Sequence, residues 1–182
     1  MPRNLLVVRC VLILTSVLML SACGILSSGE SVAYHVWNHD RERIVFSPTL
    51  ESGGKILDGG VGSRRSRRSP TSNGWDGSGG NYFPLDTGHH IPERAKLTWY
   101  LPAKGGQEEW QGDLVGPFDV DIRTRIPERV LKRIRGNRDA LLAIGVSVGM
   151  RPIKLRWILK EANFVDGKRQ GGWRNVEHGG DW

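Results

Sequence analysis

The chain has 182 residues, a formal net charge of +7 and two cysteines. This length suits one domain, and two cysteines exclude a disulfide-rich scaffold and a four-cysteine zinc site. The basic charge is compatible with nucleic-acid binding, so its meaning depends on where it lies along the chain and in which compartment the protein resides.

Residues 1–22 have the pattern of a secretory signal peptide. Arg3 and Arg9 precede an apolar run of 11 residues that begins at Cys10, which is too short to cross a bilayer but typical of a signal-peptide core. The run ends in Leu-Ser-Ala-Cys23, which resembles the lipobox of bacterial lipoproteins, where the cysteine is lipidated and becomes the new N-terminus. An ordinary signal peptide that ends by chance in a cysteine is the alternative.

The lipobox resemblance implies a lipid anchor on Cys23, which would hold the mature chain stably at a membrane without a spanning segment. Because Gly24 rather than aspartate follows the cysteine, the sorting pattern of such lipoproteins implies the inner leaflet of the outer membrane, facing the periplasm. Nucleic acid is scarce there, so we expect no nucleic-acid partner. Removal of Arg3 and Arg9 lowers the formal charge to +5.

Residues 23–30 are expected to form a short tether before the folded domain. Alternating apolar residues predict a first strand over 31–38, and a second strand is predicted to begin at 44–46, where Pro48 would end it early. In the following segment, 52–80, nine of 29 residues are glycine. This composition predicts a long mobile loop.

Regular patterning resumes after residue 91. Strands are predicted over 95–101 and 107–114, paired antiparallel through a glycine-containing turn. A third strand is predicted over 118–122, with Asp119 and Asp121 on its exposed face.

One convincing helix is predicted over 127–135, because Pro127 suits a first turn and Gly136 a helix end. The almost entirely apolar segment 140–148 predicts a central strand, and 153–160 alternates as a further strand. The remainder, 162–182, is expected to be a polar, glycine-rich tail. We therefore predict a mostly β protein: an antiparallel β-sandwich-like single domain, 31–161, with one short α-helix.

Several strand motifs are similar to those of a family of bacterial lipoproteins without an assigned biochemical activity. Members are encoded beside phospholipase effectors of type VI secretion systems, and several are the immunity proteins of those effectors. The similarity covers residues 31–161 and is strongest over 91–161. The motifs that carry it are Ile91-Pro92-Glu93, Leu97-Thr98-Trp99, Glu109-Trp110-Gln111-Gly112, a helix near Val130–Ile134, the glycine-bracketed strand that ends at Gly149, and a last strand with Trp157.

The first strand, with Trp37-Asn38-His39, is similar to a neighbouring lipoprotein family. The arginine-rich loop and the glycine-rich tail depart from the usual pattern of the main family. A different loop in the binding region implies a different partner even where the fold is shared.

The sequence offers no local constellation for metal binding or catalysis. His35 and His39 would lie too far apart along a strand to share a metal unless a turn folded them back, and His89 and His90 are expected to be solvated loop residues. The chain lacks both a Gly-x-Ser-x-Gly elbow and a His-Glu-x-x-His helix. We therefore expect no metal, no cofactor and no enzymatic activity.

Two arginine clusters are the best indication of function. One lies in the 52–80 loop beside Trp75, and the other spans 123–138, where seven basic residues oppose Glu128 alone. A solvated surface, an acidic protein partner and anionic lipid or lipopolysaccharide phosphate are the three interpretations, and arginine pairs well with both carboxylate and phosphate. The candidate partner-binding residues are Arg64, Arg65, Arg67, Arg68, Trp75, Arg129, Lys132 and Arg133.

The expected function is that of a periplasmic lipoprotein that binds a protein partner. The family resemblance implies that this partner is a type VI secretion phospholipase effector, which the chain would neutralise as an immunity protein. The alternative is a structural lipoprotein of the cell envelope that contacts anionic lipid or cell-wall polymer through its basic residues.

Overall fold

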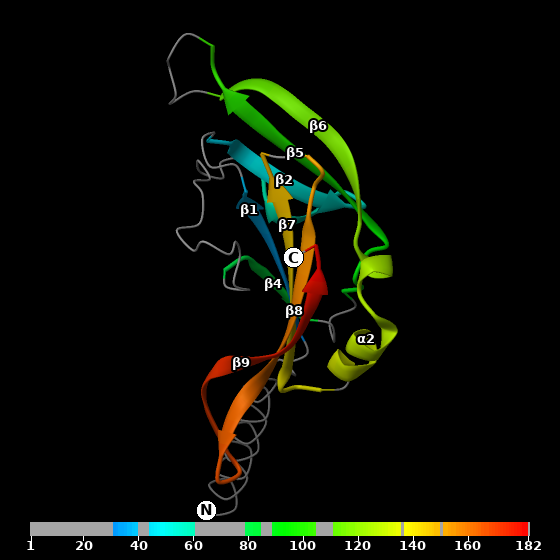
Figure 1. The fold of residues 1–182 in the computed structure, drawn as a ribbon, viewed down its shortest axis with the longest axis vertical. Helices are drawn as coiled ribbons and strands as arrows, with labels where there is room; N and C mark the ends of the chain where they lie inside the picture. Colours follow the sequence, from blue (N-terminus) through cyan, green and yellow to red (C-terminus); the bar gives the residue numbers. More distant parts are fainter. Residues whose placement is uncertain are drawn as a thin grey trace, which may run out of the picture.

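The computed structural model describes residues 31–39, 44–60, 79–84, 89–104, 111–135, 137–149 and 151–181. They form two β-sheets and two short helices, as Figure 1 shows. The five-stranded sheet has the order β4 (Asn81–Pro84), β1 (Ser31–Asn38), β7 (Ala140–Val148), β8 (Leu155–Val165), β9 (Lys168–Gly180). The four-stranded sheet has the order β3 (Lys55–Gly59), β2 (Phe46–Ser52), β5 (Arg94–Pro102), β6 (Gln111–Asp121). The helices are the 3₁₀-helix η2 (Arg123–Arg125) and the α-helix α2 (Glu128–Ile134).

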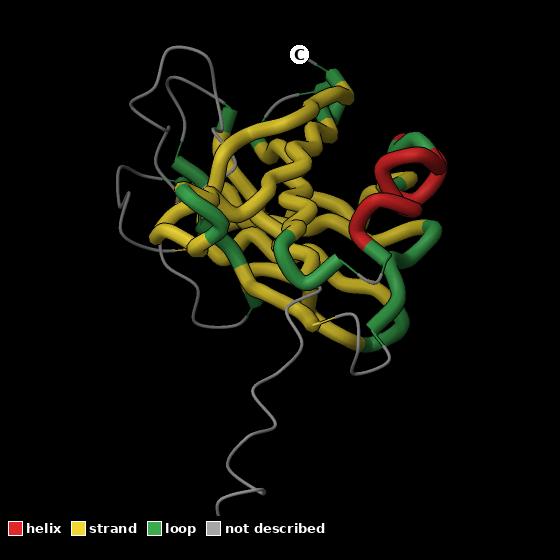
Figure 2. The backbone as a smooth tube through the Cα atoms, turned by 90° about the horizontal axis from the view of Figure 1, so that it is seen from below, coloured by secondary structure: helices red, strands yellow, loops and turns green. Residues whose placement is uncertain are grey.

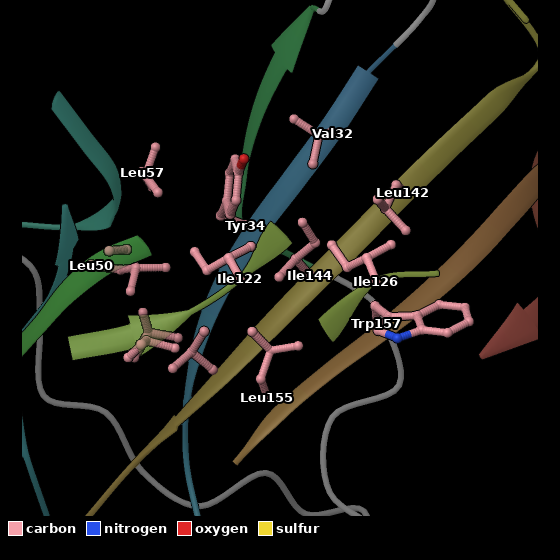
Figure 3. Close-up of a cluster of buried hydrophobic side chains, with 14 of the residues drawn as sticks. Val32, Tyr34, Leu50, Leu57, Ile122, Ile126, Leu142, Ile144, Leu155 and Trp157 are labelled. Carbon is pink, nitrogen blue, oxygen red and sulfur yellow. The ribbon is translucent and has the colours of Figure 1, made fainter. Parts of the chain in front are cut away.

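The predicted mostly β, sandwich-like fold with one short α-helix is confirmed. The two sheets enclose one large apolar core, and Figure 3 shows Leu50 and Leu57 of the four-stranded sheet facing Tyr34 and Ile144 of the other. Strand pairing is antiparallel at every interface except β1–β7, which is parallel. That parallel pair is a departure from the purely antiparallel expectation.

Strand β7 lies at the centre of the five-stranded sheet, as its apolar sequence predicts. All nine of its residues are buried, which is typical of a strand covered on both faces. Leu142 and Ile144 belong to the core between the sheets, whereas Ala143 packs against Trp37 and Ile158 on the opposite face.

The two strands predicted over 107–114 and 118–122 are parts of a single strand, β6, in the described residues. Gly116 lies at the point where the pairing of β5 with β6 changes register, with φ +108°. A Cβ there would lie 2.7 Å from the Leu97 carbonyl oxygen, so only glycine fits. Glycine marks an irregularity within this strand, where the sequence suggested an interruption.

The expected loop over 52–80 is wrong at its beginning, because β3 occupies Lys55–Gly59. Gly53 and Gly54 both have positive φ and form the turn between β2 and β3, as a two-residue hairpin turn requires. Leu57 is 1% exposed and anchors β3 in the core. The remainder of the expected loop, 61–78, lies outside the described residues.

The expected tail over 162–182 is also wrong. Strand β8 continues to Val165 and β9 occupies Lys168–Gly180, so the sheet extends well beyond the predicted domain boundary at 161. Asp166 and Gly167 have φ of 51° and 73° and form the turn. An Asp-Gly pair between two strands is a strong hairpin motif, and the glycine-rich composition around it obscured that motif.

The predicted helix is confirmed, with Pro127 directly before its first residue. Val130, Leu131 and Ile134 are buried against the core and hold α2 at the edge of the strand layers, as Figure 2 shows. Because these three apolar residues occupy one side of the helix, its basic residues remain at the surface. No helix among the described residues is long and apolar enough to cross a membrane.

Candidate partner-binding surface at helix α2

The segment from η2 to α2 is positioned by buried residues on either side of it. Ile122 and Ile126 are 0% and 3% exposed and fix both ends of η2 in the core. The Trp157 side chain donates a hydrogen bond from Nε1 to the Arg125 carbonyl oxygen at 3.2 Å. This contact ties the backbone of the basic segment to strand β8, so the arginine side chains project from a rigid base.

Two arginines of α2 reach strands β8 and β9. The Arg129 guanidinium donates to the Glu177 carboxylate at 2.5 Å, and that of Arg133 lies 2.7 Å from the Glu161 carboxylate. These arginine side chains are 71% and 46% exposed. Exposed ion pairs of this kind contribute about 0–1 kcal/mol to stability, because water screens them.

Arg125 pairs with Asp181, which also accepts a hydrogen bond from the Leu155 backbone N–H at 2.9 Å. The Asp181 carboxyl has a pKa below its usual value: burial acts to raise it, but the Leu155 hydrogen bond and the Arg125 guanidinium together outweigh that effect. The Asp181 carboxylate therefore joins η2 to the start of β8.

Glu128 lies between two arginines at the start of α2. Arg123 donates to the Glu128 carboxylate at 2.9 Å, and Arg135 lies 4.0 Å from its other oxygen. The hydrogen bond from Arg123 holds the pKa of Glu128 below its usual range. Glu128 thus remains ionised and offsets part of the charge of both arginines.

The basic segment 123–138 is consequently closer to negative charge than its sequence indicates. Its arginines share four carboxylates, of which three come from β8, β9 and the residue after β9: Glu128, Glu161, Glu177 and Asp181. Among the described residues, no carboxylate forms an ion pair with Lys132 or Arg138, both of which are exposed. These two cations and the weakly held arginines are the part of the surface available to an acidic partner.

A pocket of about 300 Å³ adjoins the helix. Its polar lining comes from His89, His90, Arg123 and Arg135, while Leu131 contributes an apolar wall. The residues come from η2, α2 and the segment before β5, so three parts of the chain meet there. A pocket with arginines around an apolar wall suits a carboxylate-bearing side chain.

His89 is buried, at 9% exposure, which corrects the expectation of a solvated histidine. Its ring stacks on Phe83 with centroids 4.6 Å apart, and its Nε2 lies 3.2 Å from the Tyr34 hydroxyl. The Lys55 Nζ lies 3.5 Å from Nδ1, and an ammonium group can only donate. Nδ1 therefore accepts, and the proton of the neutral ring lies on Nε2, directed at the Tyr34 oxygen.

Burial lowers the pKa of His89, and the charges of Lys55 and His90 lower it further. Burial raises the pKa of Tyr34. Both rings are consequently neutral at neutral pH. Of this cluster, His89 lines the pocket, and its contacts with Phe83 and Tyr34 hold its ring in place.

Of the predicted partner-binding residues, the structure brings Arg129, Lys132 and Arg133 together on one helix. The other five, Arg64, Arg65, Arg67, Arg68 and Trp75, lie outside the described residues, as does Cys23. Sequence reasoning did not select Arg123, Arg135 and His89, which line the pocket. The two arginines belong to the recognised basic run, but no sequence pattern indicated that His89 lies beside them.

Within the described part of the chain, no three His, Cys, Asp or Glu side chains approach one another closely enough to hold a metal ion. His35 lies 3.9 Å from Asp58, but the Asp58 carboxylate is already engaged by the Val36 backbone N–H at 2.6 Å. Burial raises the pKa of Asp58 despite that hydrogen bond. The Asp58 carboxylate therefore serves as the hydrogen-bond acceptor for a β1 backbone N–H that lies beyond the last β1–β4 pair.

Comparisons with models of protein families, with curated proteins and with solved structures found no match for this chain.

Proposed function

We propose that the chain is a non-enzymatic lipoprotein, anchored by Cys23 to the inner leaflet of the outer membrane, that binds a protein partner in the periplasm. The binding site is the α2 surface, defined as the exposed or pocket-lining cations Arg123, Arg129, Lys132, Arg133 and Arg135. The observation that carries this proposal is that Arg123 and Arg135 line a pocket of about 300 Å³ with an apolar wall, while Arg129, Lys132 and Arg133 lie on the same short segment of the chain.

The arginines of the α2 surface suit contact with carboxylates of a partner. Arg129 and Arg133 pair with Glu177 and Glu161, whose side chains are only 27% and 17% exposed, so the guanidinium groups reach solvent more than their carboxylates do. Because a guanidinium has five N–H donors, a partner's carboxylate can bind its exposed side while the internal ion pair stays in place. Arginine is also enriched among residues that dominate binding energy at protein interfaces.

The resemblance to immunity lipoproteins supports a type VI secretion phospholipase effector as the partner. Such an enzyme acts on membrane lipid, so an inhibitor held at the membrane by Cys23 meets it where it acts. Tethering raises the effective concentration of the inhibitor at that surface. The arginine cluster Arg64, Arg65, Arg67 and Arg68, with Trp75, is proposed as a second contact segment.

Growth protection tests this function. A phospholipase effector encoded in the same genome is directed to the periplasm of a sensitive strain, and the full chain is produced with it. We expect the chain to restore growth and Arg129→Glu to weaken protection. Arg94→Glu is the matched control, because Arg94 is 72% exposed against 71% for Arg129 and also pairs with a carboxylate, that of Asp121.

Equal protection by both variants would show that the α2 surface is not the binding site. If the unaltered chain fails to protect while the lipidated protein is present in the envelope, the immunity function is refuted. If the chain instead binds anionic vesicles through Arg129 without binding the effector, the structural role in the envelope replaces the immunity role.

A further inference from the structure

The β8–β9 hairpin extends beyond the sheet to which it belongs. Strand β7 begins at Ala140, which pairs with Glu161. Ala162 still donates a backbone hydrogen bond to the Asp139 carbonyl oxygen at 2.8 Å, and beyond it the strand partner of β8 is β9. We call residues 162–174 the β8–β9 arm, and Figure 1 shows it extending away from the body of the protein. A two-stranded hairpin of this kind gains little from its own packing.

The arm carries exposed apolar and basic side chains. Every residue from Phe164 to Arg174 is exposed, and the exposed fractions of Phe164, Val165 and Trp173 are 50%, 56% and 37%. The Arg169 guanidinium lies over the Trp173 ring, 5.3 Å from its centroid, while Arg169 pairs with Phe164 across the hairpin. These three side chains therefore form one aromatic and basic face.

The register places the start of β1 at the same end of the sheet as the arm. Leu141 pairs with Ser31 of β1 on one side and with Lys160 of β8 on the other. This is the pair next to Ala140–Glu161, where the β7–β8 ladder ends. The arm then continues for five residues to its turn at Asp166, or about 17 Å at about 3.3 Å per residue. The chain thus enters the described domain from the side toward which the arm extends.

The length of the tether matches the reach of the arm. Eight residue steps separate Cys23 from Ser31, and an extended chain spans at most about 3.3–3.6 Å per residue, or about 26–29 Å. A membrane that holds the lipid of Cys23 therefore lies within reach of a hairpin about 17 Å long that extends from the same end.

We infer that the β8–β9 arm is a membrane-contact element, whose Phe164, Val165 and Trp173 enter the interface of an anionic phospholipid bilayer while Lys168 and Arg169 meet its headgroups. This inference rests on the proposed lipid anchor at Cys23. The arm is a second attachment point, which fixes the orientation of the anchored domain and directs the α2 surface along the membrane.

The composition of the arm favours a lipid surface over a protein partner. Tryptophan and phenylalanine beside lysine and arginine are typical of segments that lie at the membrane interface. Three cations, Lys168, Arg169 and Arg174, oppose Asp166 alone in the arm. Arg169 also pairs with Asp139 and Arg174 with Glu161, but both arginine side chains are more than half exposed and remain open to anionic headgroups. The exposed side chains lie on both faces of the hairpin tip, as insertion into lipid allows.

A site-specific fluorescent label tests the inference on the mature lipidated protein. Val165→Cys introduces the only free thiol, because Cys10 lies in the signal peptide and Cys23 carries the lipid. Leu114→Cys is the matched control: Leu114 is 55% exposed, like Val165 at 56%, and belongs to β6 in the other sheet. Both proteins are labelled with an environment-sensitive dye and reconstituted into vesicles of phosphatidylethanolamine and phosphatidylglycerol, with and without nitroxide-bearing lipid.

We expect the label at 165 to shift to shorter wavelength and to lose intensity with nitroxide lipid, and the label at 114 to do neither. Protein that floats with the vesicles but is not quenched at 165 overturns the membrane contact and leaves the lipid anchor intact. A wavelength shift at 165 without quenching assigns the arm to a protein contact, a second copy included, and also overturns it. Protein that does not float contradicts the anchor and the inference together.

Discussion

At the scale of single residues, His89 is a buried side chain that lines the pocket. Sequence reasoning missed both its burial and its place beside the pocket. Its ring is held by stacking on Phe83 and by polar contacts to Tyr34 and Lys55. Burial lowers its pKa, so the unfolded chain binds a proton at a higher pH than the folded chain. Folding stability contributed by the neutral ring is therefore lost as pH falls below the unfolded value, near 6.5.

The variant His89→Gln tests this linkage, because glutamine preserves a polar partner for Tyr34 but does not titrate. We expect the unaltered protein to lose more free energy of unfolding between pH 7.5 and pH 5.5 than the variant does. Urea unfolding at the two pH values measures the difference. An identical loss in both proteins would mean that His89 is not held neutral by burial.

The acids that pair with the basic segment show why the site could be predicted only in part. The helix and its cations follow from local pattern, but Glu161, Glu177 and Asp181 lie 28, 48 and 56 residues from their arginine partners. Only the register of β8 with β9 brings them to α2. The sequence therefore indicated a concentrated positive charge, whereas the structure shows arginines distributed over ion pairs.

At the scale of elements, β1 and the helix were predictable because apolar residues recur at the correct period, and β7 because its sequence is almost entirely apolar. Strands β3 and β9 were not, because glycine and polar residues dominate their composition. Two features define these strands. One is the turn before each strand, Gly53-Gly54 for β3 and Asp166-Gly167 for β9, and the other is the side chain against which the strand packs. For β9 that is Trp157, since a Cβ at Gly179 would lie 2.5 Å from its ring.

Gly179→Ala tests how β9 packs on β8. The added methyl group meets the Trp157 ring, so we expect the free energy of unfolding to fall by about 1–3 kcal/mol, as for other overpacked sites. Gly171→Ala is the control within the same strand, because nothing lies within 4 Å of a Cβ at that position. Denaturant unfolding of both variants is the measurement, and equal stability would argue that residues near 179 do not pack on Trp157.

At the scale of the whole molecule, the α2 surface and the β8–β9 arm belong to one structural unit. Arg129 and Arg133 of α2 pair with Glu177 and Glu161, which lie on β9 and β8. An arm fixed at the membrane would therefore also fix the orientation of the α2 surface. In the proposed account, the tether and the arm hold the basic α2 surface close to lipid, where it would bind its partner.

Salt dependence follows from a binding site made of exposed cations. We expect the affinity of the mature protein for the phospholipase effector to fall as salt rises from low to physiological concentration, mainly through a slower association rate, because screening shortens the reach of charge to about 8 Å. Association and dissociation rates at several salt concentrations test this. An association rate that does not change with salt would contradict electrostatic capture by the α2 surface.

The most direct test of partner binding at the α2 surface is a titration of the purified mature protein with the purified phospholipase effector. Lys132→Glu is the informative variant, because no described carboxylate lies within ion-pair distance of Lys132 and only the charge of Glu128, one helical turn away, acts on it. We predict measurable binding by the unaltered protein and a loss of affinity of about tenfold, or about 1.4 kcal/mol, in Lys132→Glu, with Arg94→Glu unchanged. An affinity in Lys132→Glu equal to that of the unaltered protein, or no binding by any of the three, would contradict the account.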